Sequence, residues 1–150
     1  YQKLKNVKNR KKIKNKFYLL EEFILEQIKN DNKVKMNKFD QNVLIHGHCH
    51  QKSQDRMKGL TGLLSELKIN NKTIESSCCG MAGSFGYDNK NYEVSKKMAN
   101  LSLIPAINNS DETDFIIANG TSCRHQIADL ADKKGKHVSE LLFKIFETVN

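Results

Sequence analysis

The chain has 150 residues, 38% of them hydrophobic and 7% aromatic, and a formal net charge of +8. This length suits one ordinary domain with a core large enough to fold without disulfide staples. No apolar run approaches the roughly 18 residues of a membrane-spanning helix, and we recognise no signal peptide. We therefore expect no transmembrane segment and a cytoplasmic location, at most peripheral at the inner face of the membrane.

The positive charge is confined to residues 1–16, which carry eight Lys or Arg and no acidic residue. The rest of the chain carries seventeen basic and seventeen acidic side chains. Nucleic-acid binding would depend on this one stretch, which has no aromatic residue beyond Tyr1 to stack on bases. We predict a solvated basic linker at 1–16, a single domain at 17–150 and no nucleic-acid partner. Because the chain starts inside a basic run without Met, we also expect a fragment of a longer protein.

Helices and strands are predicted to alternate along residues 17–150. Apolar residues with the helical period indicate helices, and short apolar runs indicate buried strands. The helices are expected over 17–28, 53–67, 92–107, 123–133 and 139–149, and the strands over 43–45, 72–75 and 114–118. Pro105 is expected to break the helix over 92–107. The alternation predicts an α/β fold with a mostly parallel sheet flanked by helices.

All four cysteines follow predicted strands. Cys49 follows the first strand, Cys78 and Cys79 follow the second, and Cys123 follows the third. Open α/β sheets bind ligands beyond the carboxyl ends of their strands. The topology thus predicts that the four thiols converge on one site at this edge of the sheet.

Free thiols in a chain without secretory features argue against structural disulfides. Any one cysteine alone would be interpreted as a buried core residue, but none lies in the body of a predicted helix or strand. Four thiolates complete either an iron–sulfur cluster or a tetrahedral zinc site. The adjacent pair Cys78 and Cys79 departs from the CxxC spacing of zinc sites and suits a cluster, which offers each thiolate its own metal atom. Zinc remains the alternative.

A thiolate-bound metal centre carries negative charge that the protein must compensate. The loop after the second strand contains Gly80 and Gly83, which favour a tight turn with exposed backbone amides. The amino end of the helix near Cys123 and the side chain of Arg124 are further candidates for this role.

Four histidines lie near the cysteines. His46, His48 and His50 alternate, and on an extended segment they would share one side. His125 follows Cys123 by two residues. Each is a candidate for ligating a metal or for hydrogen-bonding to cluster sulfur, whereas His137 is expected to be structural or exposed.

A cysteine-dependent hydrolase is a further alternative, because His48 and His50 flank Cys49 and a neighbouring histidine can activate a thiolate. Sequence neighbours on a strand point to opposite faces, however, so adjacency alone does not provide the required hydrogen bond.

Three motifs occur in order along the chain: HGHCHQKS at 46–53, SCCGMAGSFGYD at 77–88 and GTSCRHQI at 120–127. Together they resemble the cysteine-rich CCG domain found in heterodisulfide reductases and at the carboxyl end of FAD-linked D-2-hydroxy-acid dehydrogenases, of the D-lactate, D-2-hydroxyglutarate and glycolate oxidase types. The resemblance implies an iron–sulfur electron-transfer domain, with FAD bound in a missing amino-terminal part. It also implies flavin and ferredoxin-like domains and a downstream electron acceptor as partners.

The resemblance also implies the ligand set. In that family the ligands are one cysteine, the CC pair and a terminal CxxC. Cys49, Cys78, Cys79 and Cys123 match the first four positions, whereas Gln126 stands at the fifth. A 4Fe–4S cluster with four thiolates, or one with a histidine ligand, is therefore expected. The alternative function is a non-catalytic zinc-binding or protein-docking module.

Overall fold

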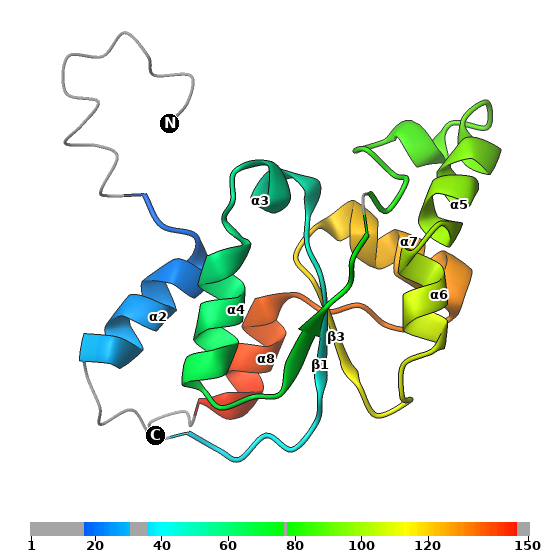
Figure 1. Ribbon diagram of the computed structural model, residues 1–150. Coiled ribbons are helices and arrows are strands. Elements are labelled where there is room, and N and C mark those ends of the chain that lie inside the picture. Colours follow the sequence, from blue (N-terminus) through cyan, green and yellow to red (C-terminus); the bar gives the residue numbers. More distant parts are fainter. Residues whose placement is uncertain (1–16, 31–35, 77, 147–150) are drawn as a thin grey trace, which may run out of the picture.

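The computed structural model describes residues 17–30, 36–76 and 78–146 (Figure 1). The predicted basic linker at 1–16 lies outside the described residues. The strands are β1 Val43–His46, β2 Asn71–Thr73 and β3 Phe115–Ala118. The helices are α2 Leu20–Asn30, α3 Cys49–Ser53, α4 Met57–Glu66, the 3-10 turn η1 Phe85–Tyr87, α5 Tyr92–Asn100, α6 Leu103–Asn108, α7 Thr121–Ala131 and α8 Val138–Ile145. Within these ranges no helix has both the length and the apolar character needed to cross a membrane.

The sheet has the order β2-β1-β3, and both strand pairs are parallel. The chain crosses from β1 to β2 through α3 and α4, and from β2 to β3 through η1, α5 and α6. Strands β1 and β3 are buried at every position, as expected where helices cover both faces of a parallel sheet. The predicted α/β fold with a parallel sheet flanked by helices is confirmed.

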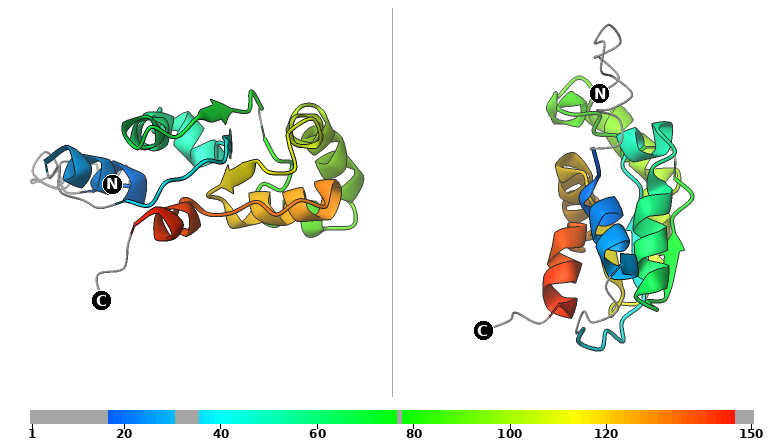
Figure 2. Two further views of the ribbon diagram at one scale, coloured as in Figure 1. Left: turned by 90° about the horizontal axis from the view of Figure 1, so that it is seen from below. Right: turned by 90° about the vertical axis from the view of Figure 1, so that its left-hand side faces the viewer.

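Helices lie on both faces of the sheet (Figure 2). Alternate strand residues pack against them in two separate cores. Val43 and Ile45 of β1 pack with leucines of α4 and α8, and α2 adds partly buried side chains to this core. Leu44 points the other way and packs with residues of α6 and α7. The second core also contains Cys79 and Cys123, so one wall of the candidate site is continuous with packed apolar side chains.

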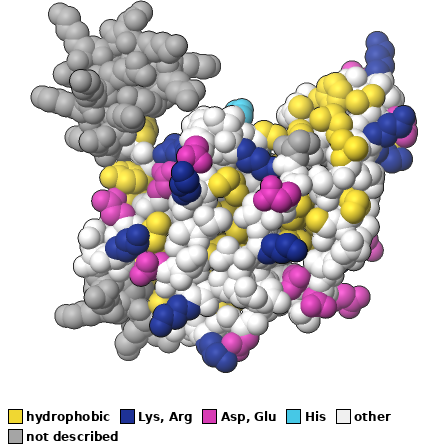
Figure 3. Space-filling model, in the orientation of Figure 1, with side chains coloured by type: hydrophobic (Ala, Val, Ile, Leu, Met, Phe, Trp, Pro, Cys, Tyr) yellow, Lys and Arg dark blue, Asp and Glu magenta, His cyan; other side chains and the backbone are white. Residues whose placement is uncertain are grey.

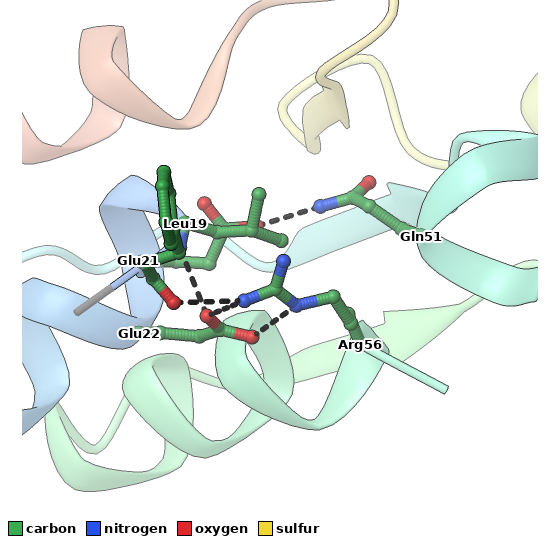
Figure 4. Close-up of polar contacts among 6 residues, drawn as sticks. Leu19, Glu21, Glu22, Gln51 and Arg56 are labelled. Carbon is green, nitrogen blue, oxygen red and sulfur yellow. Dashed lines mark hydrogen bonds and ion pairs between the residues drawn. The ribbon is translucent and has the colours of Figure 1, made fainter. Parts of the chain in front are cut away.

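Helix α2 is held against α3 and α4 by two consecutive carboxylates (Figure 4). Glu22 accepts two hydrogen bonds from the Arg56 guanidinium, at 2.9 Å from Nε and 2.5 Å from Nη2. Glu21 is only 3% exposed, and its Oε1 accepts a 2.6 Å hydrogen bond from Nε2 of Gln51. Gln51 lies on α3, the helix that begins with Cys49.

Two predicted helices differ from the helices of the structure. The predicted helix over 53–67 corresponds to α4, while α3 precedes it and ends at Ser53, and Asp55 between α3 and α4 has a left-handed φ of 53° that helices do not continue through. The predicted helix over 92–107 divides at Leu101 and Ser102, not at Pro105. Pro105 is the third residue of α6, where the backbone N–H of a helix has no intrahelical acceptor and proline costs little.

We predict that Glu21→Ala lowers the free energy of unfolding by about 2 kcal/mol, because the buried Gln51 amide loses a charged acceptor. Urea denaturation monitored by circular dichroism measures the change. Glu66→Ala, at an exposed position of α4, is the control and should change stability by less than about 0.5 kcal/mol. Equal effects of the two substitutions would contradict a structural role for the Glu21–Gln51 contact.

Candidate metal centre

Three strand ends bring the four cysteines together at one edge of the sheet (Figure 1). Cys49 is the first residue of α3, Cys78 and Cys79 lie in the loop after β2, and Cys123 is the third residue of α7. All four are free thiols. The predicted convergence beyond the carboxyl ends of the strands is present in the structure.

The thiols fall into an outer pair and an inner group. In the outer pair, Sγ of Cys49 and Sγ of Cys78 are 3.7 Å apart, and both residues are partly exposed. In the inner group, Cys79 and Cys123 are each 2% exposed. A ring nitrogen of His46 and the two inner sulfurs all lie within 4.8 Å of one another. The vicinal thiols of Cys78 and Cys79 therefore belong to different groups.

The inner group concentrates negative charge on one sulfur. A hydrogen bond from the Cys123 thiol is the largest of the effects that lower the pKa of Cys79 to about 4, and the His46 imidazole and the Met81 backbone amide act in the same direction against burial. The pKa of Cys123 is raised, first by this hydrogen bond to Cys79 and then by burial. Of the two inner thiols, Cys79 is thus the one whose pKa this arrangement lowers, with Cys123 as its hydrogen-bond donor.

The outer pair has weaker electrostatic support. Burial raises the pKa of Cys49, and its contact with Cys78 adds to the shift, while the Lys52 ammonium opposes it. The backbone N–H of Gly80 donates to the Cys78 sulfur at 3.3 Å. Burial and the proximity of His50 lower the pKa of His48.

The loop that carries Cys78 and Cys79 depends on Gly80. Its φ is +89°, and a Cβ atom there would collide with the backbone oxygen of Ser95 on α5. Gly83 also has a positive φ, +74°, but a Cβ atom there would meet nothing within 4 Å. Its carbonyl accepts a 3.2 Å hydrogen bond from the Ser122 hydroxyl on α7. The loop is thereby connected to the helices on both sides of the site.

Gln126 is buried beside this loop, with 4% of its surface exposed. Its Nε2 donates to the Ser95 hydroxyl at 3.0 Å. Ser95 in turn contacts the Met81 sulfur at 3.8 Å. Gln126 therefore connects α7 to α5, and Ser95 of α5 in turn contacts Met81 of the cysteine loop. Nothing in the local sequence around Ser95 identifies it as part of this site.

Among the predicted histidines, His46 is the one that lies with cysteines in the inner group. The chain turns into α3 at Cys49, so the segment is not extended throughout. The rings of His48 and His50 contact each other edge to face, with their centroids 5.3 Å apart. His125 is exposed and its Nδ1 is hydrogen-bonded to the Tyr87 hydroxyl. His137 caps α8 through its Nδ1, as a structural residue.

Arg124 is directed to the turn between β3 and α7. Its guanidinium donates to the carbonyls of Ala118 and Asn119 at 3.0 and 2.9 Å and to the Thr121 hydroxyl at 3.2 Å. These contacts hold the amino end of α7, and with it Cys123, against the end of β3. Compensation of thiolate charge by direct contact comes from backbone amides and from His46 in the described residues.

The donor set fits a soft metal centre. Nε2 of His46 is buried and has no hydrogen-bond partner within the described residues, so it is available either to a bound group or to the neighbouring sulfurs. A Cβ atom at Gly120 would lie 2.9 Å from Sγ of Cys123 and would collide with Cδ2 of His48. The absence of a side chain at Gly120 therefore lets the His48 ring lie close to the Cys123 sulfur. Four thiols with one such imidazole suit an iron–sulfur cluster or zinc. The fold and site together define an α/β domain with a thiol-rich candidate metal centre.

Two curated proteins are similar to parts of this chain. One is a D-2-hydroxyglutarate dehydrogenase from Pseudomonas putida, 24% identical over 102 residues, which are 67% of this chain and 10% of that protein. The other is a D-2-hydroxyglutarate dehydrogenase from Haemophilus influenzae, 31% identical over 70 residues, which are 47% of this chain and 7% of that protein.

The similarity relates this chain to a short region of oxidoreductases, since it spans about a tenth or less of their length. No family model matches the chain, and no solved structure is significantly similar to it. The resemblance to D-2-hydroxy-acid dehydrogenases is thus supported, whereas no family model confirms the CCG domain.

We predict that Gly80→Ala destabilises the protein more than Gly83→Ala. Both substitutions force alanine into a left-handed conformation, at a cost of about 1–2 kcal/mol, but only the methyl group at position 80 also collides with the Ser95 backbone. Denaturant titration of both variants measures the difference. Equal losses would show that the packing of α5 against the loop does not constrain Gly80.

We also predict that the metal-free protein keeps one thiolate down to about pH 4, because folding lowers the pKa of Cys79 to about 4. The contribution of the Cys79 thiolate to the free energy of unfolding is complete above the ordinary cysteine pKa of about 8.5. It is lost as the pH falls through the lowered pKa. Ultraviolet thiolate absorbance should follow this titration and disappear in Cys79→Ser.

In the same experiment Cys123→Ala should raise the titration midpoint, because Cys79 loses its hydrogen-bond donor. Cys49→Ala is the matched control, and it should leave the midpoint in place, since Cys49 is not among the groups that shift Cys79. A midpoint near the ordinary cysteine value in the unsubstituted protein would contradict the assignment of Cys79 as the thiolate.

Proposed function

We propose that this chain is an iron–sulfur electron-transfer domain of an FAD-linked oxidoreductase that oxidises a 2-hydroxy acid of the D-lactate, D-2-hydroxyglutarate or glycolate class. The observation that carries the proposal is the convergence of thiols from three strand ends on one half-buried site. The similarity to a short region of D-2-hydroxyglutarate dehydrogenases supports a redox role over a purely structural one.

The different surroundings of the vicinal cysteines favour a cluster. Cys78 faces Cys49 at 3.7 Å, whereas Cys79 faces Cys123 and His46. A cluster offers separate iron atoms to neighbouring thiolates, so the four cysteines are the proposed ligands. When bound, a 4Fe–4S cluster would accept and release single electrons. The chain's own contribution is to hold the thiolates, to donate hydrogen bonds to sulfur and to bury the inner side of the centre.

The surface beside the site supports contact with a redox partner. Phe85, Tyr87, Tyr92 and Val94 of η1 and α5 are 36–56% exposed, and Figure 3 shows hydrophobic side chains gathered over this region. These residues directly follow the cysteine loop in sequence. We propose that flavin and ferredoxin-like domains of a longer chain or complex supply the electrons here, and that FAD belongs to that other part.

A second candidate function is a zinc-binding or docking module. Two thiolates on one tetrahedral zinc ion, with bonds of about 2.3 Å, lie about 3.8 Å apart. The 3.7 Å separation of the Cys49 and Cys78 sulfurs agrees with this distance. Four thiolates on one zinc ion would hold the three strand ends together without electron transfer.

The metal content of anaerobically purified protein separates the two candidates. We expect about four irons per chain, by cluster stoichiometry, with visible absorption and an EPR signal on reduction. Cys79→Ser should lose most of the iron. Ser53→Ala, which removes an exposed hydroxyl on α3 bonded to the His50 carbonyl, is the control and should retain it. Stoichiometric zinc and no iron after anaerobic reconstitution would overturn the cluster in favour of the second candidate.

A further inference from the structure

Three side chains outside the cysteine set form a line of hydrogen bonds that ends at His46, beside the inner thiols. The Lys52 ammonium donates to the Ser76 hydroxyl at 3.4 Å and also to the Ser76 carbonyl. The Ser76 hydroxyl lies 3.0 Å from Nδ1 of His46. His46 is 1% exposed, and a nitrogen of its ring lies within 4.8 Å of the Cys79 and Cys123 sulfurs.

The chemistry of the three groups gives this line a direction. An ammonium group only donates, so the Ser76 oxygen accepts from Lys52. The hydroxyl hydrogen of Ser76 then has one acceptor among these partners, Nδ1 of His46. A neutral imidazole that accepts at Nδ1 carries its hydrogen at Nε2. Nε2 is the buried ring atom without a hydrogen-bond partner in the described residues, so this tautomer places a buried N–H within the group formed by His46, Cys79 and Cys123.

The backbone around Lys52 makes the contact possible. Lys52 lies on α3, one turn after His48, and its chain runs over Gly47, where a Cβ atom would come within 2.9 Å of Cε of Lys52. The ammonium thereby reaches across from the end of β1 to Ser76, in the segment after β2. The charge that polarises Ser76 comes from the helix that also begins with Cys49.

We infer that Lys52 and Ser76 are positioning residues that fix His46 as an Nε2–H donor to the Cys79 and Cys123 sulfurs, and that His46 is not a metal ligand. Hydrogen bonds to ligand sulfur raise the reduction potential of iron–sulfur centres, because they stabilise the added negative charge of the reduced state. This second consequence depends on the proposed cluster, whereas the tautomer of His46 does not.

The tautomer is tested by nitrogen-15 NMR of the chain in a diamagnetic state, metal-free or zinc-loaded. We expect His46 to carry its hydrogen on Nε2 in the unsubstituted protein. Ser76→Ala should introduce a fraction of the Nδ1–H form, and Ser76→Thr, which keeps the hydroxyl, should restore the original spectrum. A hydrogen on Nδ1 in the unsubstituted protein would overturn the inference, as would a zinc-bonded Nε2.

The reduction potential of the iron-loaded protein provides the second readout. His46→Gln and Ser76→Ala should each shift the potential to more negative values while the iron content stays unchanged. Ser76→Ala is the decisive variant because it breaks the line without removing the Lys52 charge. Lys52→Arg keeps a donor and should retain most of the original potential. Lys58→Met, at an exposed lysine paired with Asp55, is the control outside this line of contacts and should leave the potential unchanged.

The outcomes distinguish failure of this inference from failure of the proposed function. An unchanged potential in Ser76→Ala, or strong nitrogen-14 coupling of a bonded imidazole in pulsed EPR, would overturn the role of His46 while leaving the cluster in place. Absence of iron would overturn the proposed function, and the NMR result would still decide the role of the three residues.

Discussion

The need to stabilise a buried thiolate is the constraint on which the rest of the site depends. Cys79 lies in the second core with 2% of its surface exposed, and an uncompensated charge there would be strongly unfavourable. The compensating groups come from separate strand ends: His46 from β1, the Met81 amide from the loop after β2, and the Cys123 thiol from the first turn of α7. The Met81 amide lies two residues after Cys79, but His46 and Cys123 are far away in sequence, so the thiolate requires the parallel sheet that brings them together.

The supporting contacts serve the same end. Glu21 fixes α3 through Gln51, Gln126 fixes α5 through Ser95, and Arg124 fixes the start of α7. Each contact is a polar interaction of a buried or partly buried side chain at the edge of a core. A donor left there without an acceptor would lower the free energy of unfolding more than an apolar side chain of the same size would. These residues therefore determine where the cysteines lie, although their own side chains belong to other elements.

The sequence predicts the arrangement of the site better than its details. Cysteines that follow short apolar runs are expected at the carboxyl ends of parallel strands, because the position depends only on burial patterns and on topology. The separation of Cys78 from Cys79 into different groups could not be predicted, because it depends on the path of the loop at Gly80. The prediction that His46, His48 and His50 share one side assumes an extended segment, whereas the chain enters α3 at Cys49. The alternating spacing is equally compatible with a strand end and with a capped helix. Contacts between elements, such as that of Ser95 with Gln126, leave no local pattern at all.

The position of Gln126 links the fold to the composition of the site. A side chain three residues after Cys123 on α7 lies on the same face of the helix and points toward the cysteine loop. In this chain that side chain is an amide, and its hydrogen bond to Ser95 satisfies a buried hydroxyl that a thiol would leave with a weaker partner. Ser95 of α5 both packs on Gly80 and accepts the hydrogen bond from Gln126. A change of Gln126 to cysteine would therefore alter the number of thiols and the packing of α5 together. A fifth thiolate at this position would both add a charge beside the inner group and remove the hydrogen bond between Gln126 and Ser95.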